Sequence, residues 1–340
     1  MRIMTTACFV VGACLALGVG AGATACGGSD EEQQVATGAT TDSTPTTTAA
    51  AEQDLEELQV EGAPMAVATS EGAVWVVLEQ GDRVARIDPA SGEVVGEPVP
   101  VGNGAVGVVA EAGSVWVASR YDNTVTRIDS SSNEVVGKPI PVGGRPMAIG
   151  AGEGSVWVFN TQDGTVTQID AKTGKVVSTS PRIVGRAAGN ADYAGLAVGD
   201  GSVWIASPAE NTIARIDARS NRPAGEPIQV GAGPTGVAAA DGAVWVTTLD
   251  DGSVTRIDPQ TGQVVGEPIA VGGQPVAAAA EAGSVWVVDQ AGTVIEIDAE
   301  ANAPTGEAIS VGGRPLSVAI GNGAVWVANP LSNTVGRIGL

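Results

Sequence analysis

Seven polar or aromatic residues at irregular positions could together bind a ligand. The chain has only two tyrosines, Tyr121 and Tyr193, and arginines stand close to both in the sequence. Tyrosine and arginine dominate binding hot spots, and a guanidinium group can hold a carboxylate or phosphate through paired hydrogen bonds. The candidate ligand-binding residues are Arg120, Tyr121, Arg145, Arg186, Asp192, Tyr193 and Arg314. They predict recognition of a protein or of a small anionic ligand, and the alternative is that they are ordinary solvated loop residues.

The absence of histidine limits the chemistry that the chain could perform. The sequence contains no His, so it lacks the commonest general base, and no Ser–His or Cys–His pair can form. Carboxylates remain at Glu79, Asp192 and Asp289, and a lyase or hydrolase that uses them is an alternative to pure binding. A spacer protein without a ligand is a third reading. Because nothing in the sequence pairs these acids, we assign no catalytic residue and favour a protein that is not an enzyme.

Acidic residues recur in the expected turns, but their spacing is not that of a metal-binding loop. A calcium loop places several oxygen ligands within one short segment, whereas these acids are separated by whole repeats. We therefore interpret them as turn formers, with a divalent-cation surface as the alternative, and expect no metal and no cofactor. The acids in the turns nearest the tryptophans are Glu71, Glu111, Glu153, Asp200, Asp241 and Glu281.

Seven repeats must position these residues, because each tryptophan of the chain stands in the same motif. The intervals between successive tryptophans are 40 to 47 residues. A repeat of this length that contains four short, Val-rich runs predicts the blade of a β-propeller. The sequence therefore predicts an all-β, seven-bladed propeller with four antiparallel strands per blade. The tryptophans, which we expect to pack between blades, are Trp75, Trp116, Trp157, Trp204, Trp245, Trp286 and Trp326.

Residue types within the repeat predict the order of the strands. A small residue precedes each tryptophan by nine positions, so the first strand should lie innermost, where the blades crowd together. Prolines recur in the fourth run, which should be the outer edge strand, because an edge strand tolerates proline. The segment 54–61 reads as an outer strand without a blade of its own, and we expect it to pair with 333–338 and close the ring. The arginines of the third strands should pair with nearby acids; they are Arg86, Arg127, Arg215, Arg256 and Arg337.

The candidate ligand-binding residues should share one face of this ring. Two sets of loops meet there: those from the second to the third strand, and those from the outer strand to the next inner strand. The longest interval between tryptophans places its extra residues at 181–195, which adds Arg186, Asp192 and Tyr193 to this face. We call it the top face.

The segments "IPVGGRPMAI" at 140–149 and "VWVANPLSNTVGRI" at 325–338 resemble the YVTN-type propeller repeat of bacterial extracytoplasmic proteins. The resemblance covers about 55–340 and implies the propeller architecture, but little about activity. A similar seven-bladed fold belongs to streptogramin lyase, whose chemistry depends on a histidine base and a magnesium ion. Since this chain has no His, that catalytic set has no counterpart here.

The N-terminal residues predict export and anchoring. Arg2 precedes an apolar run at 7–25, and "ATACGGSD" at 23–30 resembles a bacterial lipobox. We therefore expect a signal peptide at 1–25, lipidation of Cys26, a disordered polar tether at 26–53 and a propeller at 54–340. The protein would lie on the outer face of the cell membrane; plain secretion and an uncleaved transmembrane helix are the alternatives.

The charge of the chain restricts its partners. The sequence has 17 Lys and Arg against 38 Asp and Glu, which argues against nucleic acid and against direct contact of the body with anionic lipid. We expect a monomer that touches the membrane only through its lipid anchor. Its partner would be an envelope protein or an anionic small ligand.

Overall fold

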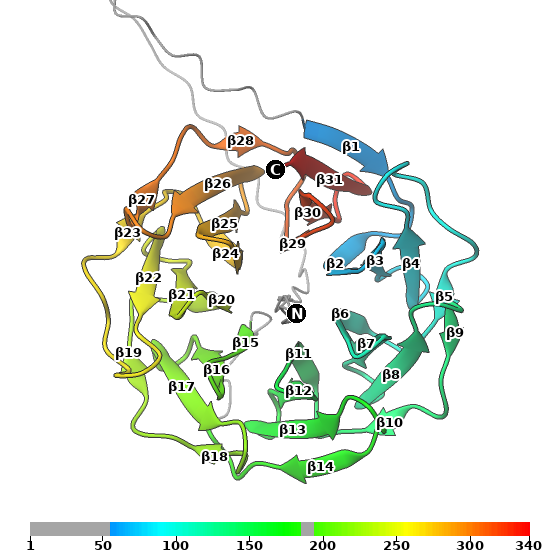
Figure 1. Cartoon of the computed structure of the whole chain (residues 1–340), viewed down its shortest axis with the longest axis horizontal. Coiled ribbons are helices and arrows are strands. Elements are labelled where there is room, and N and C mark those ends of the chain that lie inside the picture. Colours follow the sequence, from blue (N-terminus) through cyan, green and yellow to red (C-terminus); the bar gives the residue numbers. More distant parts are fainter. Residues whose placement is uncertain (1–54, 185–193) are drawn as a thin grey trace, which may run out of the picture. The chain divides into compact units, whose positions relative to one another are not determined.

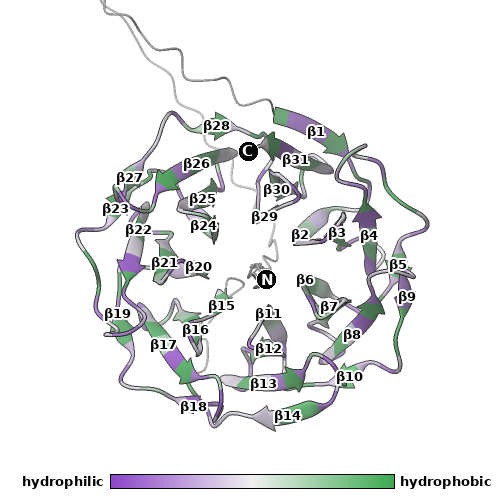
Figure 2. Ribbon diagram, in the orientation of Figure 1, coloured by the Kyte–Doolittle hydropathy of each residue, from purple (hydrophilic) through white to green (hydrophobic). Residues whose placement is uncertain are grey.

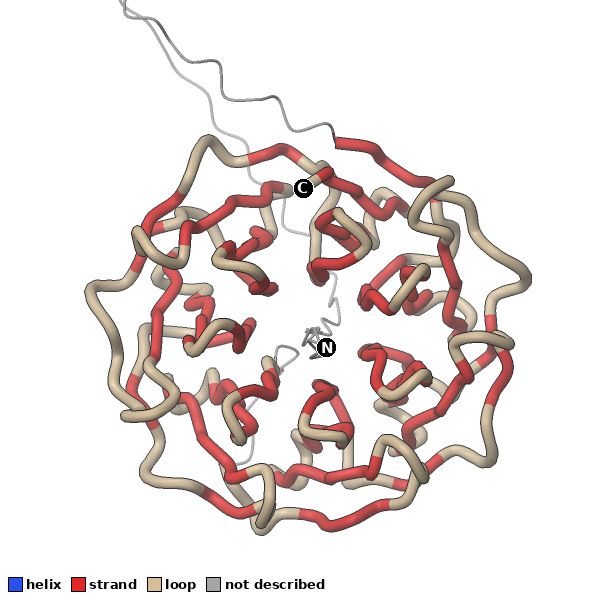
Figure 3. Tube along the Cα trace, viewed as in Figure 1, coloured by secondary structure: helices blue, strands red, loops and turns tan. Residues whose placement is uncertain are grey.

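The described residues form seven antiparallel blades arranged in a ring (Figure 1). The computed structural model describes residues 55–184 and 194–340. Strands and loops account for all of this part of the chain, and none of it is helical (Figure 3). No helix in these ranges is therefore long and apolar enough to cross a membrane. The seven-bladed propeller predicted from the tryptophan repeats is confirmed.

The blades are numbered here in chain order from the strand that begins at Pro64. The inner strands are β2 (Pro64–Ser70), β6 (Ala105–Glu111), β11 (Pro146–Gly152), β15 (Leu196–Gly199), β20 (Pro234–Ala240), β24 (Pro275–Glu281) and β29 (Ser317–Gly321). The second strands are β3 (Ala73–Leu78), β7 (Ser114–Ser119), β12 (Ser155–Asn160), β16 (Ser202–Ser207), β21 (Ala243–Thr248), β25 (Ser284–Asp289) and β30 (Ala324–Asn329).

The third strands are β4 (Arg83–Ile87), β8 (Thr124–Asp129), β13 (Thr165–Asp170), β17 (Thr212–Asp217), β22 (Ser253–Ile257), β26 (Thr293–Asp298) and β31 (Thr334–Gly339). The outer strands of blades one to three are β5 (Val99–Pro100), β9 (Glu134–Val135) with β10 (Ile140–Pro141), and β14 (Val176–Thr179). Those of blades four to seven are β18 (Arg222–Pro223) with β19 (Ile228–Gln229), β23 (Ile269–Ala270), β27 (Ala303–Pro304) with β28 (Ile309–Ser310), and β1 (Leu55–Gln59).

Small residues line the crowded axis, as the sequence predicts. A Cβ placed on Gly195 would lie 2.1 Å from the Thr235 carbonyl oxygen of the next blade, so only glycine fits there. The first strand of each blade is innermost in Figure 1, and the proline-containing strands are outermost. Both predictions of strand order are confirmed.

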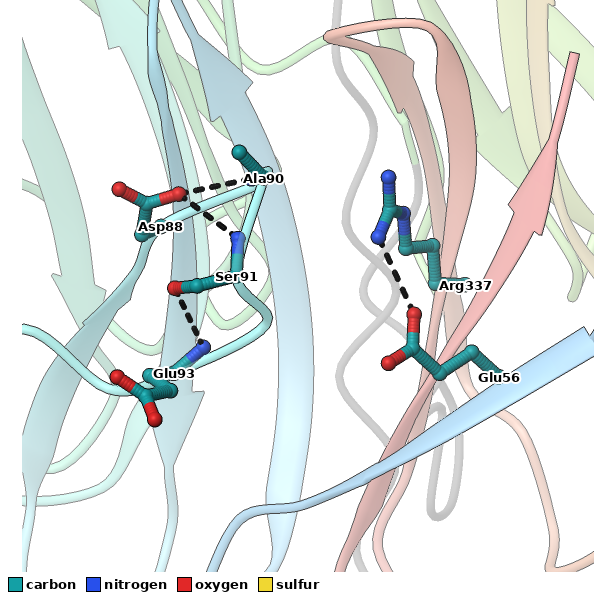
Figure 4. Close-up of polar contacts among 6 residues, drawn as sticks. All are labelled: Glu56, Asp88, Ala90, Ser91, Glu93 and Arg337. Carbon is teal, nitrogen blue, oxygen red and sulfur yellow. Dashed lines mark hydrogen bonds and ion pairs between the residues drawn. The ribbon is translucent and has the colours of Figure 1, made fainter.

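The N-terminal strand closes the ring by completing blade seven. β1 pairs with β31 in antiparallel register from Leu55 opposite Ile338 to Gln59 opposite Thr334. Arg337 Nη1 lies 3.1 Å from Glu56 Oε2 across this pair (Figure 4). The expected closure is confirmed, with the strand at 55–59 inside the predicted 54–61.

The tryptophans are buried, as predicted, and five of them carry an arginine on the ring. Each tryptophan is at most 1% exposed. The guanidinium carbon lies 5.0 to 5.6 Å from the ring centroid in the pairs of Arg86 with Trp75, Arg127 with Trp116, Arg215 with Trp204, Arg256 with Trp245 and Arg337 with Trp326. The expected pairing with a nearby acid is found for Arg337, which meets Glu56, whereas the partner common to all five arginines is the tryptophan ring.

Aspartates at the ends of the third strands also form turns. Asp88 Oδ1 accepts hydrogen bonds from the amides of Ala90, at 2.7 Å, and Ser91, at 3.1 Å (Figure 4). Hydrogen bonds from the Ser131 hydroxyl and from the amides of Ser132 and Ser131 lower the pKa of Asp129 to about 2. Carboxylates that accept backbone hydrogen bonds in this way stabilise a turn in their ionised form.

Two glutamates differ from the other acids with which the sequence grouped them. Glu111 and Glu281 are the last residues of inner strands, and Ala112 and Ala282 take the left-handed turn positions at φ 51°. Burial raises the pKa of the Glu111 carboxyl. The grouping of these two with the turn formers was therefore wrong. No cluster of three or more potential metal ligands occurs in the described ranges.

Candidate functional site

The two sets of top loops are joined by backbone hydrogen bonds within each blade. The amide of Arg120 donates to the Gly104 carbonyl at 2.9 Å, and the amide of Thr161 donates to the Arg145 carbonyl at 3.0 Å. In blade six, the amide of Gln290 donates in the same way to the Gln274 carbonyl at 3.1 Å. The segment before each of these inner strands is therefore held against the loop that follows the second strand.

Side-chain acceptors also tie neighbouring blades together on this face. Asn123 Oδ1 accepts a hydrogen bond from the Arg145 amide at 2.7 Å, which links blades two and three. Asn333 Oδ1 accepts from the Ala63 amide at 2.9 Å and links blades seven and one. Both asparagines have φ near 55°, a left-handed conformation that asparagine tolerates well. Arg145 is thus fixed through its own backbone by the preceding blade.

Arg120 and Tyr121 form a stacked pair at the junction of blades one and two. Arg120 is 3% exposed, and its Nη2 lies 2.8 Å from Glu79 Oε1. Its guanidinium carbon lies 4.8 Å from the centroid of the Tyr121 ring. A Cβ on Gly104 would lie 2.5 Å from Tyr121 Cδ2, so the ring also rests on a position that must lack a side chain.

This arrangement gives the two neighbours different roles. Tyr121 is 65% exposed, although one side of its ring is covered by the arginine. Arg120 is buried and acts by positioning the tyrosine, so a ligand on the top face would touch Tyr121 instead. The sequence alone could not separate these roles.

The other two described candidates lie on either side of this pair, Arg145 on blade three beside blade two and Arg314 on blade seven beside blade one. Arg314 precedes the inner strand of blade seven, and its Nε donates a 3.0 Å hydrogen bond to Gln290 Oε1; its Nη2 contacts the same oxygen. Arg145 precedes the inner strand of blade three and is half-buried. Arg186, Asp192 and Tyr193 lie outside the described residues, as does Cys26.

The structure adds Leu331, which the sequence reasoning missed. It lies in the top loop of blade seven, at the position that Tyr121 occupies in blade two, and it is 62% exposed. The sequence signal was a single leucine in a loop that otherwise has small and polar residues. The corresponding residues of blades one and three are Gln80 and Gln162, both uncharged and exposed.

The exposed apolar side chains of the top face lie on one half of the ring. Blades seven, one, two and three are consecutive in the ring, and they carry Leu331, Tyr121 and the two candidate arginines Arg145 and Arg314. We call this half the Tyr121–Leu331 surface. Blades four and five present the exposed acids Glu210, Asp250 and Asp251, and the Tyr121–Leu331 surface also has exposed acids, at Glu61 and Asp122.

The carboxylates that could have served catalysis have structural partners. Glu79 is paired with Arg120 in blade one. Asp289 in blade six is 8% exposed and accepts hydrogen bonds from the backbone amides of Ala291, at 2.6 Å, and Gln274. Asp192 lies outside the described residues. Glu79 and Asp289 thus stand in different blades and each stabilises a local contact.

Two hollows in the described part of the chain lie away from these residues. One of about 420 Å³ is lined by Glu153, Asp200 and Asp241 in the turns at the opposite end of three inner strands. The other, of about 550 Å³, lies on the rim between blades four and five beside Arg215. Neither hollow is lined by a candidate ligand-binding residue.

These features define a seven-bladed β-propeller. Residues 52–267 match the family described as outer membrane protein assembly factor BamB. Because the match covers more than half of the chain, the protein belongs to that family. No curated protein matches the sequence significantly.

Solved structures support the same architecture. A streptogramin B lyase structure superimposes with a TM-score of 0.72 at 19% identity, over 84% of this chain and 97% of that one. The virginiamycin B lyase of Staphylococcus aureus gives 0.70 at 18% identity, over 85% and 100%. BamB from Moraxella catarrhalis gives 0.52 at 15% identity, over 82% and 85%. At these identities the likeness concerns the fold alone.

Proposed function

We propose that this protein is a lipid-anchored, extracytoplasmic binding module that holds a protein partner on its Tyr121–Leu331 surface. One observation carries the proposal: Tyr121 is 65% exposed although its ring is stacked on a buried, ion-paired arginine. A tyrosine held in one orientation loses little conformational entropy when a partner covers it. The family name, which describes assembly of outer membrane proteins, supports a role in binding proteins.

The chemistry of the surface indicates the kind of partner. Tyr121 and Leu331 offer two exposed apolar anchors, and Arg145 and Arg314 precede the inner strands of blades three and seven, which are on the same half of the ring. A matching partner presents apolar side chains with carboxylates beside them.

The anchor follows from the N-terminal sequence. Lipidation of Cys26 would hold the chain at the membrane, and residues 27–53 would span roughly 30 Å as a flexible coil. This distance keeps a strongly acidic propeller clear of anionic headgroups. Cys26→Ala should release the protein into the medium, as measured by immunoblotting of fractionated cells. Retention of the variant in the membrane would point to an uncleaved transmembrane segment.

Capture of a partner tests the binding surface. The protein should cross-link to a discrete envelope protein in intact cells, and Tyr121→Ala combined with Leu331→Ala should reduce this product at least tenfold, since each anchor contributes more than about 1 kcal/mol. Asp250→Asn, in blade five on the other half of the same face, is the matched control and should leave it unchanged. An undiminished product in the double variant would show that the surface is wrongly assigned.

A further inference from the structure

The outer strand of blade three differs from those of the other blades. β14 pairs with β13 at Ile169 with Val176, Gln168 with Ser178, and Thr167 with Thr179. The ladder continues beyond it, because the Ser180 amide donates to the Val166 carbonyl at 2.8 Å. In four other blades a Gly-x-Pro sequence interrupts the outer strand, at 96–98, 137–139, 225–227 and 266–268. The glycines of these interruptions have φ between 71° and 90°.

These interruptions normally protect an edge strand from pairing with another chain. Blade six has Thr305, Gly306 and Glu307 at the corresponding place, and its outer strand is divided as well. β1 is five residues long but carries Glu56 and Glu57, and charge on an edge strand also discourages pairing. β14 has neither proline, glycine nor charge between Val176 and Thr179. Its register with β13 shifts between Gln168 and Ile169, and this irregularity is the one protective feature of the strand, which lacks the proline, glycine or charge found in the other outer strands.

β14 is also exposed in the way that an added strand requires. It is the outermost strand of its sheet, between β10 and β18 on the rim (Figure 1). Val176 is 44% exposed and Val177 57%, and Figure 2 shows this apolar stretch on the perimeter. Since successive amides of a strand point to opposite sides and the Ser180 amide points inward, the Thr179 amide points to the open edge.

Cationic side chains gather at both ends of this strand. The three lysines of the chain are all on this part of the rim, although acids outnumber bases more than twofold overall. The exposed cations of this cluster are Lys138, Lys172, Lys175, Arg182, Arg219 and Arg222. Exposed acids are fewer here, with Glu134 on β9 and Glu226 beyond β18.

Contacts between blades bring these cations together. The turn that contains Lys172 and Lys175 lies against blade two, because a Cβ on Gly174 of this turn would lie 3.8 Å from Ile140 Cδ1 of that blade. Blade four contributes through Asn221, whose Nδ2 donates to Ser178 Oγ of β14 at 3.0 Å. Arg219 and Arg222 flank that asparagine. At the other end of β14, a Cβ on Gly164 would lie 3.3 Å from Arg182 Cγ.

From these features we infer a second binding site: the edge of β14 takes up an acidic, extended polypeptide segment as an additional strand. Backbone hydrogen bonds to the open edge supply sequence-independent affinity, and the cations select for carboxylates at the ends of the segment. Lys175 and Arg182 are seven residues apart, about 23 Å in an extended chain. The bound segment therefore has an apolar or β-branched centre flanked by acids about seven residues apart.

An anionic membrane would also attract these cations, but its binding would not depend on hydrogen bonds to an open strand edge. The two are separated by a substitution that removes the edge amide and keeps the charge. Thr179→Pro does so, because the outward amide is lost while the inward bonds of Ser178 and Ser180 remain. The matched control is Gln229→Pro on β19, since Val230 donates inward there and blades one and two already have proline at this position, at Pro100 and Pro141.

The experiment measures binding of a labelled ten-residue peptide by fluorescence anisotropy. The peptide has alternating valine and threonine in its centre and two glutamates at each end. Thr179→Pro should weaken binding at least tenfold relative to the unmodified protein, and so should Lys175→Glu combined with Arg182→Glu. Gln229→Pro should leave the affinity unchanged, and a peptide with lysines in place of the glutamates should bind at least tenfold more weakly. Circular dichroism and melting curves verify that each variant is folded.

Two results would overturn the inference. One is binding of the acidic peptide to Thr179→Pro with unchanged affinity, because the strand edge would then play no part. The other is binding of vesicles of anionic lipid, but not of the peptide, with equal strength to the unmodified protein and to Thr179→Pro. That pattern would identify the cluster as a membrane-binding patch.

Discussion

Leu58→Ala should destabilise the entire propeller, because β1 closes the ring. Leu58 is 9% exposed and packs in one cluster with Trp75 and Ile87 of blade one and Trp326 and Val335 of blade seven. Truncation to alanine removes buried apolar carbons and leaves a cavity, which together cost about 2–3 kcal/mol, towards the lower end for this substitution because the site is at an edge. For a domain of this size the melting temperature should fall by roughly 5 °C.

Glu56→Ala is the matched control on the same strand. Its carboxylate pairs with Arg337, but the two side chains are 52% and 30% exposed, and such a surface pair contributes only about 0–0.5 kcal/mol. Urea unfolding followed by tryptophan fluorescence measures both variants, since every blade has one buried tryptophan. Equal unfolding midpoints for the two variants would refute the view that packing of β1 holds the ring closed.

Two further predictions concern pH. Burial raises the pKa of Glu111, whose Oε2 has no hydrogen-bond partner among the described residues, so the folded state loses stability as pH rises through that raised pKa. Glu111→Gln should therefore melt at a higher temperature than the unmodified protein at pH 7 and at the same temperature at pH 4. A lower melting temperature of the variant at pH 7 would contradict this. The pKa of Asp129 is lowered to about 2, so its carboxylate stabilises the folded state above the pKa of the unfolded chain, and this contribution is lost as pH falls towards 2. Asp129→Asn should lower the melting temperature at pH 7, and the difference from the unmodified protein should shrink in acid. A difference that does not change with pH would argue against the turn hydrogen bonds as its cause.

Much of the fold could be predicted because the same sequence pattern recurs in seven repeats. The tryptophan intervals predicted the number of blades, and small residues and prolines predicted the inner and outer strands. The arginine–tryptophan stacking was missed, although its signal was present. Each of these arginines follows its tryptophan by eleven residues, and the two stand directly opposite across the hairpin, as Arg86 and Trp75 do. Facing residues on an antiparallel pair are expected to touch.

The candidate site was predictable only as a set of residue types on one face. Arg120 and Tyr121 are adjacent in sequence and were given the same role, but one is 3% exposed and the other 65%. The difference arises because Arg120 meets Glu79, 41 residues away in the preceding blade. Leu331 was overlooked for the same reason, since its exposure depends on the loops around it.

The sequence by itself determined the architecture, because the pattern of each blade is local and is repeated along the chain. It also determined the closure, since 55–59 has the character of an outer strand and blade seven lacks one. Only the tertiary structure decided which side chains face solvent and which charges meet. Burial of Arg120 and the gathering of cations around β14 both depend on contacts between blades. Such contacts join residues from different repeats, whereas the periodic pattern of the sequence describes one repeat at a time.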